Sequence, residues 1–395
     1  MSNKQADQKI IFFAGEHSGD LHASHLLKKL RVLHPTAQFS GVGGPKMRNV
    51  GLETLLYRME DFAVMGFIDV LKSLPKLISK FRQLSRKIFQ ENPQAVVLID
   101  YPDFNLRLAK CLRKQGYQGK IVHYISPSVW AWRANRVHTM AKNLDLLLTI
   151  YPFESEYYAD TALPVNFVGN PLSEYLAAYP YNNSWKKTFN IPEESSILAL
   201  FPGSRLAELH ANLPLQLQAV EMLLKQEIAP RIIAVSCNSP EHGDLIWKEV
   251  ARYQFSKIHR IIVVPGTFTY ELMRDSRVAI AKAGTVTLEL ALHHCPTVVI
   301  YKLSKLNYYI CKYLVRLNLP HYCIVNILSQ KEVFPEYFDK KLNPEIIFNY
   351  LVQLYGETSR RKTCLDDCKQ LSNSLSGFTA SEHAAKAILK KMETK

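Results

Sequence analysis

The feature that most limits how this chain can fold is a recurring run of about five apolar residues, too short for a long helix. Such runs occupy residues 10–14, 95–99, 121–125, 144–150, 197–201, 232–235, 261–264, 278–281 and 297–300, and helix-like segments separate them. Short continuous apolar runs are typical of parallel strands buried on both faces. The sequence therefore predicts an α/β protein with two doubly wound, Rossmann-like domains facing a central cleft.

A length of 395 residues suits two domains. The Tyr-, Asn- and Pro-rich stretch from Pro171 to Glu194 predicts a linker between them. We expect one domain over residues 1–172, a second over 173–355, and a C-terminal helical segment over 356–395. The hydrophobic share of 47% excludes disordered and fibrous classes. No apolar run reaches the ~18 residues of a membrane-spanning helix, and we expect no signal peptide.

Cysteine usage and charge point to a compartment and a partner. Seven cysteines without a C-x-x-C pair are typical of reduced thiols in a cytoplasmic protein. The formal net charge is +14, and residues 1–150 hold 22 Lys and Arg against 11 Asp and Glu. This concentration predicts a surface that meets an anionic partner, such as a phosphorylated substrate, a membrane or nucleic acid, although a solvated basic face explains the charge equally well.

The segment from Phe62 to Phe89 narrows that choice, because apolar residues recur there at three- and four-residue steps, with cations between them. Such a helix is able to lie in a membrane interface, or to pack on its own sheet. We expect Pro75 to separate a short apolar turn from a longer helix. The residues expected to face a membrane are Phe67, Leu71, Leu74, Leu77, Ile78, Lys72, Lys76 and Lys80.

Two loops of the first domain follow strand ends. In residues 15–20, glycines and a serine before a helix leave backbone N–H groups for an anionic or sugar ligand, and the candidates are Glu16, Ser18, Gly19 and Asp20. Asp100 directly follows a buried strand, where partial desolvation raises a carboxyl pKa and suits it to accept a proton. Asp103 is better explained as the N-cap of the next helix.

Two loops of the second domain suit a pyrophosphate. Ser204 and Arg205 follow a strand and open a helix, with Glu208 one turn further on. Gly284 and Thr285 repeat the pattern, and Glu289 is placed to accept ribose hydroxyls. The histidine pairs lack a ligand set, so we expect no metal. Asn326, between apolar residues, reads from its context alone as a buried turn former.

Seven segments in one order resemble the lipid-A-disaccharide synthase family, inverting glycosyltransferases of the GT-B fold. They are residues 15–20, 41–47, 64–66, 99–105, 126–133, 202–205 and 284–289. The resemblance implies transfer of a diacylated glucosamine from UDP-2,3-diacylglucosamine to 2,3-diacylglucosamine 1-phosphate (lipid X), giving a β-1,6-linked disaccharide. It assigns catalytic roles to Asp100, Arg205 and Asn326, and so replaces the plain reading of Asn326.

The resemblance also implies partners and location. No metal or cofactor is expected. The first domain would bind the acceptor, and the second domain would bind the UDP-sugar. The enzyme would lie on the inner face of an anionic inner membrane, with segment 356–395 packed back on the first domain or exchanged in a homodimer. The chain departs from the family pattern at Asn170, Ala283, Gln330 and Lys331, which leaves Asp100 and Arg205 in place.

Two other functions fit part of the sequence. A UDP-sugar epimerase shares the fold and phosphate loops, but it has no need of the basic amphipathic segment. A nucleic-acid binder would use the positive charge, but no recognisable module is present, and the basic segment is mainly aliphatic instead of rich in stacking aromatics. We therefore expect no nucleic-acid partner.

Overall fold

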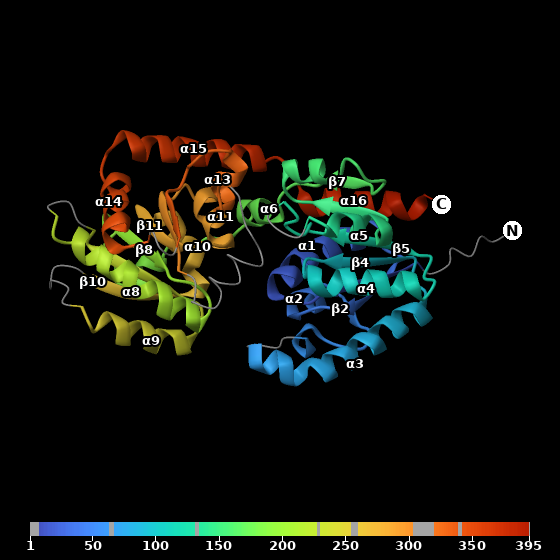
Figure 1. Ribbon diagram of the computed structural model, residues 1–395. Helices are drawn as coiled ribbons and strands as arrows, with labels where there is room; N and C mark the ends of the chain where they lie inside the picture. Colours follow the sequence, from blue (N-terminus) through green and yellow to red (C-terminus); the bar gives the residue numbers. More distant parts are fainter. Residues whose placement is uncertain are drawn as a thin grey trace. The chain divides into compact units, whose positions relative to one another are not determined.

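The computed structural model describes residues 8–62, 67–130, 134–226, 230–253, 260–302, 320–338 and 342–394, with the backbone alone given for residues 67–74 and 240. The chain forms two compact units (Figure 1). Unit 1 comprises Met1–Tyr175 and Ser376–Lys395, and unit 2 comprises Leu176–Leu375. The boundary falls inside the stretch that the sequence predicts as a linker.

Unit 1 is built on a parallel sheet in the order β3-β2-β1-β4-β5-β6-β7. The strands are β1 (Lys9–Ala14), β2 (Gln38–Val42), β3 (Glu53–Thr54), β4 (Ala95–Ile99), β5 (Lys120–Tyr124), β6 (Leu146–Thr149) and β7 (Val165–Phe167). The order reverses between β1 and β4. In open α/β sheets, ligands bind outside the carboxyl ends of the strands at such a switch point.

Helices cover both faces of this sheet. The helices of unit 1 are α1 (His17–Leu33), α2 (Pro45–Asn49), α3 (Phe67–Glu91), α4 (Pro102–Lys114), α5 (Arg136–Asn143) and α16 (Ala380–Glu393), with 3₁₀ turns at Met59–Asp61 and Pro152–Tyr158, and α6 (Pro171–Ala177) spans the boundary to unit 2. Alternate residues of a strand point to opposite faces. Ile10 and Phe12 accordingly pack in the core cluster that includes residues of α1 and α16. Ile11 and Phe13 pack in the cluster that includes residues of α3, α4 and α5.

Unit 2 repeats the scheme with a parallel sheet in the order β10-β9-β8-β11-β12-β13, and its switch point lies between β8 and β11. The strands are β8 (Ile197–Phe201), β9 (Ile232–Cys237), β10 (Arg260–Pro265), β11 (Val278–Lys282), β12 (Thr297–Tyr301) and β13 (Glu336–Phe338). The helices are α7 (Trp185–Thr188), α8 (Leu206–Leu223), α9 (Pro240–Val250), α10 (Thr269–Asp275), α11 (Thr285–Leu292), α13 (Ile324–Ser329), α14 (Pro344–Tyr355) and α15 (Ser359–Leu375), with a 3₁₀ turn at Gly266–Phe268.

The two doubly wound α/β folds expected from the sequence are confirmed, and every apolar run lies on a strand. Two local details differ from expectation. Helix α3 continues through Pro75 as a single helix and shows no separate turn before it. The segment 356–395 is divided, because α15 contacts α11, α13 and α14 of unit 2, whereas α16 contacts α1 of unit 1.

Candidate active site

Asp100 occupies the carboxyl end of β4, beside the switch point of unit 1. Asp100 and Tyr101 both have left-handed backbone angles, with φ of 49° and 46°. Two consecutive non-glycine residues in this region cost about 1–3 kcal/mol each, and such strain clusters at functional sites. The turn is held by the buried side chain of Asn105, whose Nδ2 donates to the carbonyls of Ile99 (3.1 Å) and Asp100 (2.6 Å).

The environment of Asp100 suits a general base. Burial raises the pKa of its carboxyl, while hydrogen bonds from the Tyr101 backbone and the Ser18 hydroxyl act in the opposite direction without cancelling the effect of burial. A carboxyl with a raised pKa binds an abstracted proton more strongly than an ordinary aspartate. Of the residues predicted in the loop after β1, Ser18 is therefore the one that the structure places in contact with Asp100.

The other residues of that loop have different positions. Glu16 is exposed and occupies the N-cap position of α1. Asp20 is buried, and its carboxylate accepts hydrogen bonds from the backbone N–H groups of Gly44 (2.7 Å), Lys46 (3.0 Å) and Met47 (3.1 Å). These bonds fix the start of α2. Asp20 thus has a structural use, and the substrate contact expected from its sequence position stays a prediction. Gly19 is buried against Ile99.

Aromatic side chains of β1, α3 and α4 pack beside the Asp100 turn. Phe13 of β1 stacks on Phe104 of α4, with ring centroids 4.4 Å apart, and Phe81 of α3 meets Phe104 edge to face. A Cβ at Gly15 would lie 2.7 Å from the Tyr101 ring, so only glycine lets this ring approach the loop after β1.

Two nearby assignments need correction or explanation. Asp103 is not the N-cap of α4, because Tyr101 holds that position, and Asp103 instead forms an ion pair with Arg136. Asn170, a departure from the family pattern, is buried, and its Oδ1 accepts from the N–H of Leu172 at 2.9 Å. Asn170 therefore caps the first turn of α6.

The candidate nucleotide site of unit 2 is a pocket of about 250 Å³ at the carboxyl ends of β8 and β11. The predicted residues of both loops line it together: Ser204, Arg205, Glu208, Gly284, Thr285 and Glu289. Ala283, another departure from the family pattern, and Lys282 line it as well. Gly284 is the N-cap of α11, so the free N–H groups of that helix begin at the pocket.

Glu208 ties the two loops of this pocket together. Its carboxylate accepts from the Ser204 N–H at 3.0 Å and forms ion pairs with Arg205 (3.3 Å) and Lys282 (3.2 Å). Burial raises the pKa of Glu208, but Lys282, the Ser204 N–H and Arg205 outweigh it, and the net shift is downward. Glu208 is therefore ionised at neutral pH and lies among three donors.

Glu289 presents a different carboxyl to the same pocket. Burial raises its pKa to about 7, against a hydrogen bond from the Tyr270 hydroxyl at 3.3 Å. The Tyr270 ring stacks on His293 at 5.6 Å, which fixes its direction. Glu289 thus changes its charge near neutral pH, and it suits hydroxyl groups better than phosphates as a partner.

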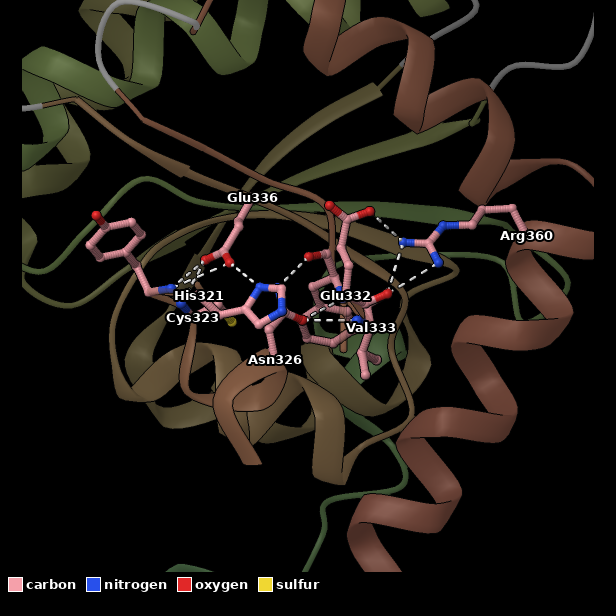
Figure 2. Close-up of polar contacts among 9 residues, drawn as sticks. His321, Cys323, Asn326, Glu332, Val333, Glu336 and Arg360 are labelled. Atoms are coloured by element: carbon pink, nitrogen blue, oxygen red, sulfur yellow. Dashed lines mark hydrogen bonds and ion pairs between the residues drawn. The ribbon is translucent and has the colours of Figure 1, made fainter. Parts of the chain in front are cut away.

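Asn326 does not line the pocket and is fully buried (Figure 2). Its Oδ1 accepts from the N–H groups of Val333 and Phe334, both at 2.9 Å, and its Nδ2 donates to the Phe334 carbonyl at 2.7 Å. With its amide thus engaged, Asn326 shapes the segment before β13, as its sequence context alone indicates. The catalytic role that the resemblance implies for it stays a prediction.

Figure 2 also shows how neighbouring groups hold this segment. Glu336 of β13 accepts from the N–H groups of Tyr322 (3.1 Å) and Cys323 (2.6 Å), before α13. Arg360 of α15 binds the carbonyls of Glu332 and Val333. Two departures from the family pattern follow Asn326: Gln330 has φ of 51°, and Lys331 pairs with Asp367 at 2.7 Å.

The candidate membrane residues on α3 are only partly described. The side chains of Phe67, Leu71, Lys72 and Leu74 lie outside the described ones, as do residues 64–66 and 131–133. Leu77 is partly buried and packs against the core cluster that includes residues of α3, α4 and α5. Lys80 donates to the Asp61 carbonyl at 2.7 Å and lies over the Tyr57 ring. Ile78 and Lys76 are exposed.

No helix among the described residues is long and apolar enough to cross a membrane. Nor do they contain a cluster of three or more His, Cys, Asp or Glu side chains able to hold a metal ion.

Sequence reasoning assigned no role to several polar residues at or beside this pocket: Ser236, Asn238, Thr269 and Lys282 line it, and Tyr270 contacts Glu289. The Lys282 ammonium binds Glu208 and lies over the Tyr301 ring at 4.8 Å. The signal was a lysine ending a buried strand, where a charge is unexpected. Tyr270 lies far from the loops in sequence, and no local pattern marks it.

Comparisons with known proteins agree with this geometry. The family model described as lipid-A-disaccharide synthetase matches residues 10–391. A lipid-A-disaccharide synthase from Chlamydia trachomatis is 38% identical over 370 residues, which cover 92% of this chain and 60% of that protein. One from Azotobacter vinelandii is 34% identical and covers 98% of each chain. The chain thus spans about 60% of the length of the chlamydial relative.

Solved structures extend the comparison to the fold. The S. aureus MnaA–UDP co-structure has a TM-score of 0.65 at 13% identity and covers 98% of each chain. The Neisseria meningitidis UDP-GlcNAc 2-epimerase bound to UDP-GlcNAc has 0.64 at 11% identity, covering 97% of this chain and 100% of that one. The glycotransferase of kitacinnamycin has 0.62 at 11%, covering 97% and 98%. The expected GT-B type of fold is confirmed.

Proposed function

The chain belongs to the lipid-A-disaccharide synthetase family, and from this premise we propose the reaction that it catalyses. It transfers a diacylated glucosamine from UDP-2,3-diacylglucosamine to 2,3-diacylglucosamine 1-phosphate, giving the β-1,6-linked disaccharide 1-phosphate and UDP. The observation that carries the proposal is the strained, desolvated Asp100 at the switch point of unit 1. The acceptor needs one proton removed, and a carboxylate of this kind suits that task.

The step balances without a covalent intermediate. The acceptor 6-oxygen forms a bond to the anomeric carbon while its proton passes to the Asp100 carboxylate. The bond between that carbon and the diphosphate oxygen breaks, and its electron pair leaves with UDP. Attack from the face opposite the leaving group inverts the anomeric centre in one displacement.

The pocket of unit 2 suits the UDP portion of the donor. Arg205, the N–H groups at the start of α11 and Lys282 offer positive charge and donors to a diphosphate, and such groups stabilise the charge that grows on a leaving group. Glu289 offers a carboxyl oxygen to the ribose hydroxyls. The two carboxyls of the pocket differ in the same way. Lys282 and Arg205 lower the pKa of Glu208, whereas no cation is among the groups that shift the pKa of Glu289.

Replacing Asp100 tests the assignment directly. We expect Asp100→Asn to lower turnover about 10²–10⁴-fold, since this is the usual contribution of a general base. UDP affinity, measured by calorimetry, should stay within twofold because the nucleotide pocket lies in unit 2. Turnover is read as UDP released from donor plus lipid X in detergent. Full activity in this variant would contradict the role of Asp100. UDP release without lipid X would favour a hydrolase, and an isomerised UDP-sugar formed without UDP release would favour an epimerase.

We also propose that α3 contacts an anionic membrane, which both lipid substrates require. Lys76, Arg82 and Arg86 are exposed along the helix, and Ile78 exposes 43% of its surface beside them. Cations near an anionic surface contribute about 1 kcal/mol each, an effect that salt screens.

Vesicle flotation checks this contact. Changing Lys76, Arg82 and Arg86 to Gln should reduce binding to anionic vesicles and leave the low binding to zwitterionic vesicles unchanged. A matched control changes Lys28, Lys386 and Lys390, exposed cations of α1 and α16 on the other face of the sheet. Equal loss in both triple variants would mean that net charge, and not α3, determines the binding.

A further inference from the structure

The carboxylate of Glu208 occupies the position of an anion in the pocket of unit 2. Three donors of different kinds converge on it: the Ser204 backbone N–H at 3.0 Å, the Arg205 guanidinium at 3.3 Å and the Lys282 ammonium at 3.2 Å. A backbone N–H at the start of a helix, a guanidinium and an ammonium are the donor set that proteins use for phosphate groups. Here a side chain of the protein itself is bound to that set.

The backbone is built to admit this carboxylate. Gly203 has φ of 130°, and a Cβ there would lie 2.5 Å from Glu208 Cβ and 2.6 Å from its Oε2. Only glycine therefore leaves room for the side chain to fold back onto its own loop. The Glu208 side chain is 18% exposed and Lys282 is 17% exposed, whereas Arg205 is 81% exposed. The Glu208 and Lys282 side chains are thus packed among other residues, whereas the Arg205 side chain is open to solvent.

A bound diphosphate and this arrangement of Glu208 exclude one another. The diphosphate would bring its negative charges next to an ionised carboxylate, because Lys282, the Ser204 N–H and Arg205 keep the pKa of Glu208 low. Like charges at contact distance in a half-buried site repel strongly. The donors are also already in use, and the single N–H of Ser204 has room for one strong acceptor.

We propose that Glu208 is an internal competitor for the diphosphate subsite: its carboxylate holds the donors in the ligand-free protein and exchanges with the incoming diphosphate. When the product leaves, the carboxylate returns, so the donors are not left unpaired. The exchange keeps Lys282 and Arg205 in position between turnovers and weakens the binding of UDP. This inference rests on the proposed nucleotide site and adds to it a means of releasing the product.

The factor by which Glu208 weakens diphosphate binding depends on how often its carboxylate is bound to the donors. If the carboxylate occupies the donors about nine-tenths of the time, the apparent Kd for a diphosphate is raised about tenfold. Removing the charge should therefore tighten diphosphate binding by about this factor. Uridine lacks phosphate, so its affinity should not change.

The experiment measures Kd by calorimetry for uridine, UDP and inorganic pyrophosphate on the full chain. In Glu208→Gln we expect UDP and pyrophosphate to bind about tenfold more tightly and uridine to bind as in the parent protein. The constant for product inhibition by UDP should fall by the same factor. Glu208→Ala removes the carboxylate completely and should act in the same direction. Thermal unfolding of each variant confirms that it is folded.

Two matched variants separate competition from positioning. Lys282→Met should weaken UDP and pyrophosphate and leave uridine unchanged, because it removes a donor of the subsite. Glu289→Gln, at the other carboxyl of the pocket, should affect uridine and UDP alike and leave pyrophosphate unchanged.

The outcomes are distinct. Weaker or unchanged binding of UDP and pyrophosphate in folded Glu208→Gln would overturn the exchange and make Glu208 a positioning residue. Tighter uridine binding in that variant would also overturn it, since the gain would not come from the phosphates. If the parent protein binds pyrophosphate but neither UDP nor uridine, the proposed nucleotide function fails, while the pyrophosphate comparison still decides the exchange.

Discussion

At the scale of single residues, the acidic side chains of this chain differ in what surrounds them far more than in their sequence context. Asp20 and Glu208 follow loops that contain glycine, and Asp100 follows a strand. Yet Asp20 binds three backbone N–H groups, and Glu208 binds two cations. Only Asp100 combines burial with a raised pKa and a strained backbone. Its role as base therefore depends on the environment that the turn provides.

The pH dependence of turnover is governed by that environment. Asp100 must be ionised to accept a proton, so turnover should rise with pH through its raised pKa. The Ser18 hydroxyl lowers that pKa. Ser18→Ala should consequently raise it further and move the acid limb of the kcat/KM profile to higher pH. Ser18→Thr, which keeps a hydroxyl, is the control, and an unmoved acid limb in Ser18→Ala would contradict the contact.

At the scale of elements, sequence patterns located the strands well when the strand was a continuous apolar run. The sequence did not predict β2, β3, β7 and β13, and each of these strands lacks such a run. For example, β2 reads Gln-Phe-Ser-Gly-Val and β3 has two exposed residues, Glu53 and Thr54. Their pairing with β1 and with each other depends on the sheet already being present. Partners remote in sequence decide such strands, and periodicity does not contain that information.

The loops of the candidate site were predictable for a related reason. Residues 15–20 and 99–105, and residues 202–205 and 283–285, follow strands that flank a switch point, where parallel sheets place their ligands. Which side chains remain available for a ligand was not predictable, since Asp20 and Asn326 are engaged by backbone groups of other segments. The amphipathic pattern of α3 also does not tell which of its apolar residues contact the core and which face solvent. Leu77, for example, packs against the core cluster.

The segment before β13 offers a test at this scale. Asn326→Ala would leave two buried N–H groups and one carbonyl without their partners. We expect a loss of roughly 2–5 kcal/mol in the free energy of unfolding, measured by urea denaturation. Asn326→Asp keeps the acceptor but opposes the Phe334 carbonyl, so it should lose less. Full stability with abolished turnover would indicate that Asn326 acts on the reactants instead.

At the scale of the whole molecule, each unit has its own sheet and its own switch point, but unit 1 is assembled from two separated parts of the chain. Its last helix, α16, contributes Ala384, Ala385, Ile388 and Met392 to the core cluster shared with α1 and β1. The sequence predicted a returning C-terminal segment but could not divide it at residue 375. Cys364 and Cys368 of α15 and Ala384 and Ala385 of α16 are buried alike, although in different units.

The division between units predicts independent effects on stability. Ile388→Ala removes a fully buried side chain of unit 1 and should cost about 2–5 kcal/mol. UDP affinity in unit 2 should not change, and saturating UDP should raise the unfolding temperature of unit 2 in the variant as in the parent protein. Val352→Ala, at an exposed position of α14, is the control. A loss of UDP affinity in folded Ile388→Ala would contradict the independence of the two units.

The return of α16 also has a consequence for the order of events on the ribosome. Unit 1 cannot close its core until residues 376–395 have been made, although its first 175 residues emerge long before. At roughly 5–20 residues per second, the intervening 200 residues of unit 2 take about 10–40 s to synthesise. During that interval the apolar surface of α1 that α16 later covers faces solvent. Unit 2 is continuous in the chain and is free to fold first, so the N-terminal half of this protein is completed last.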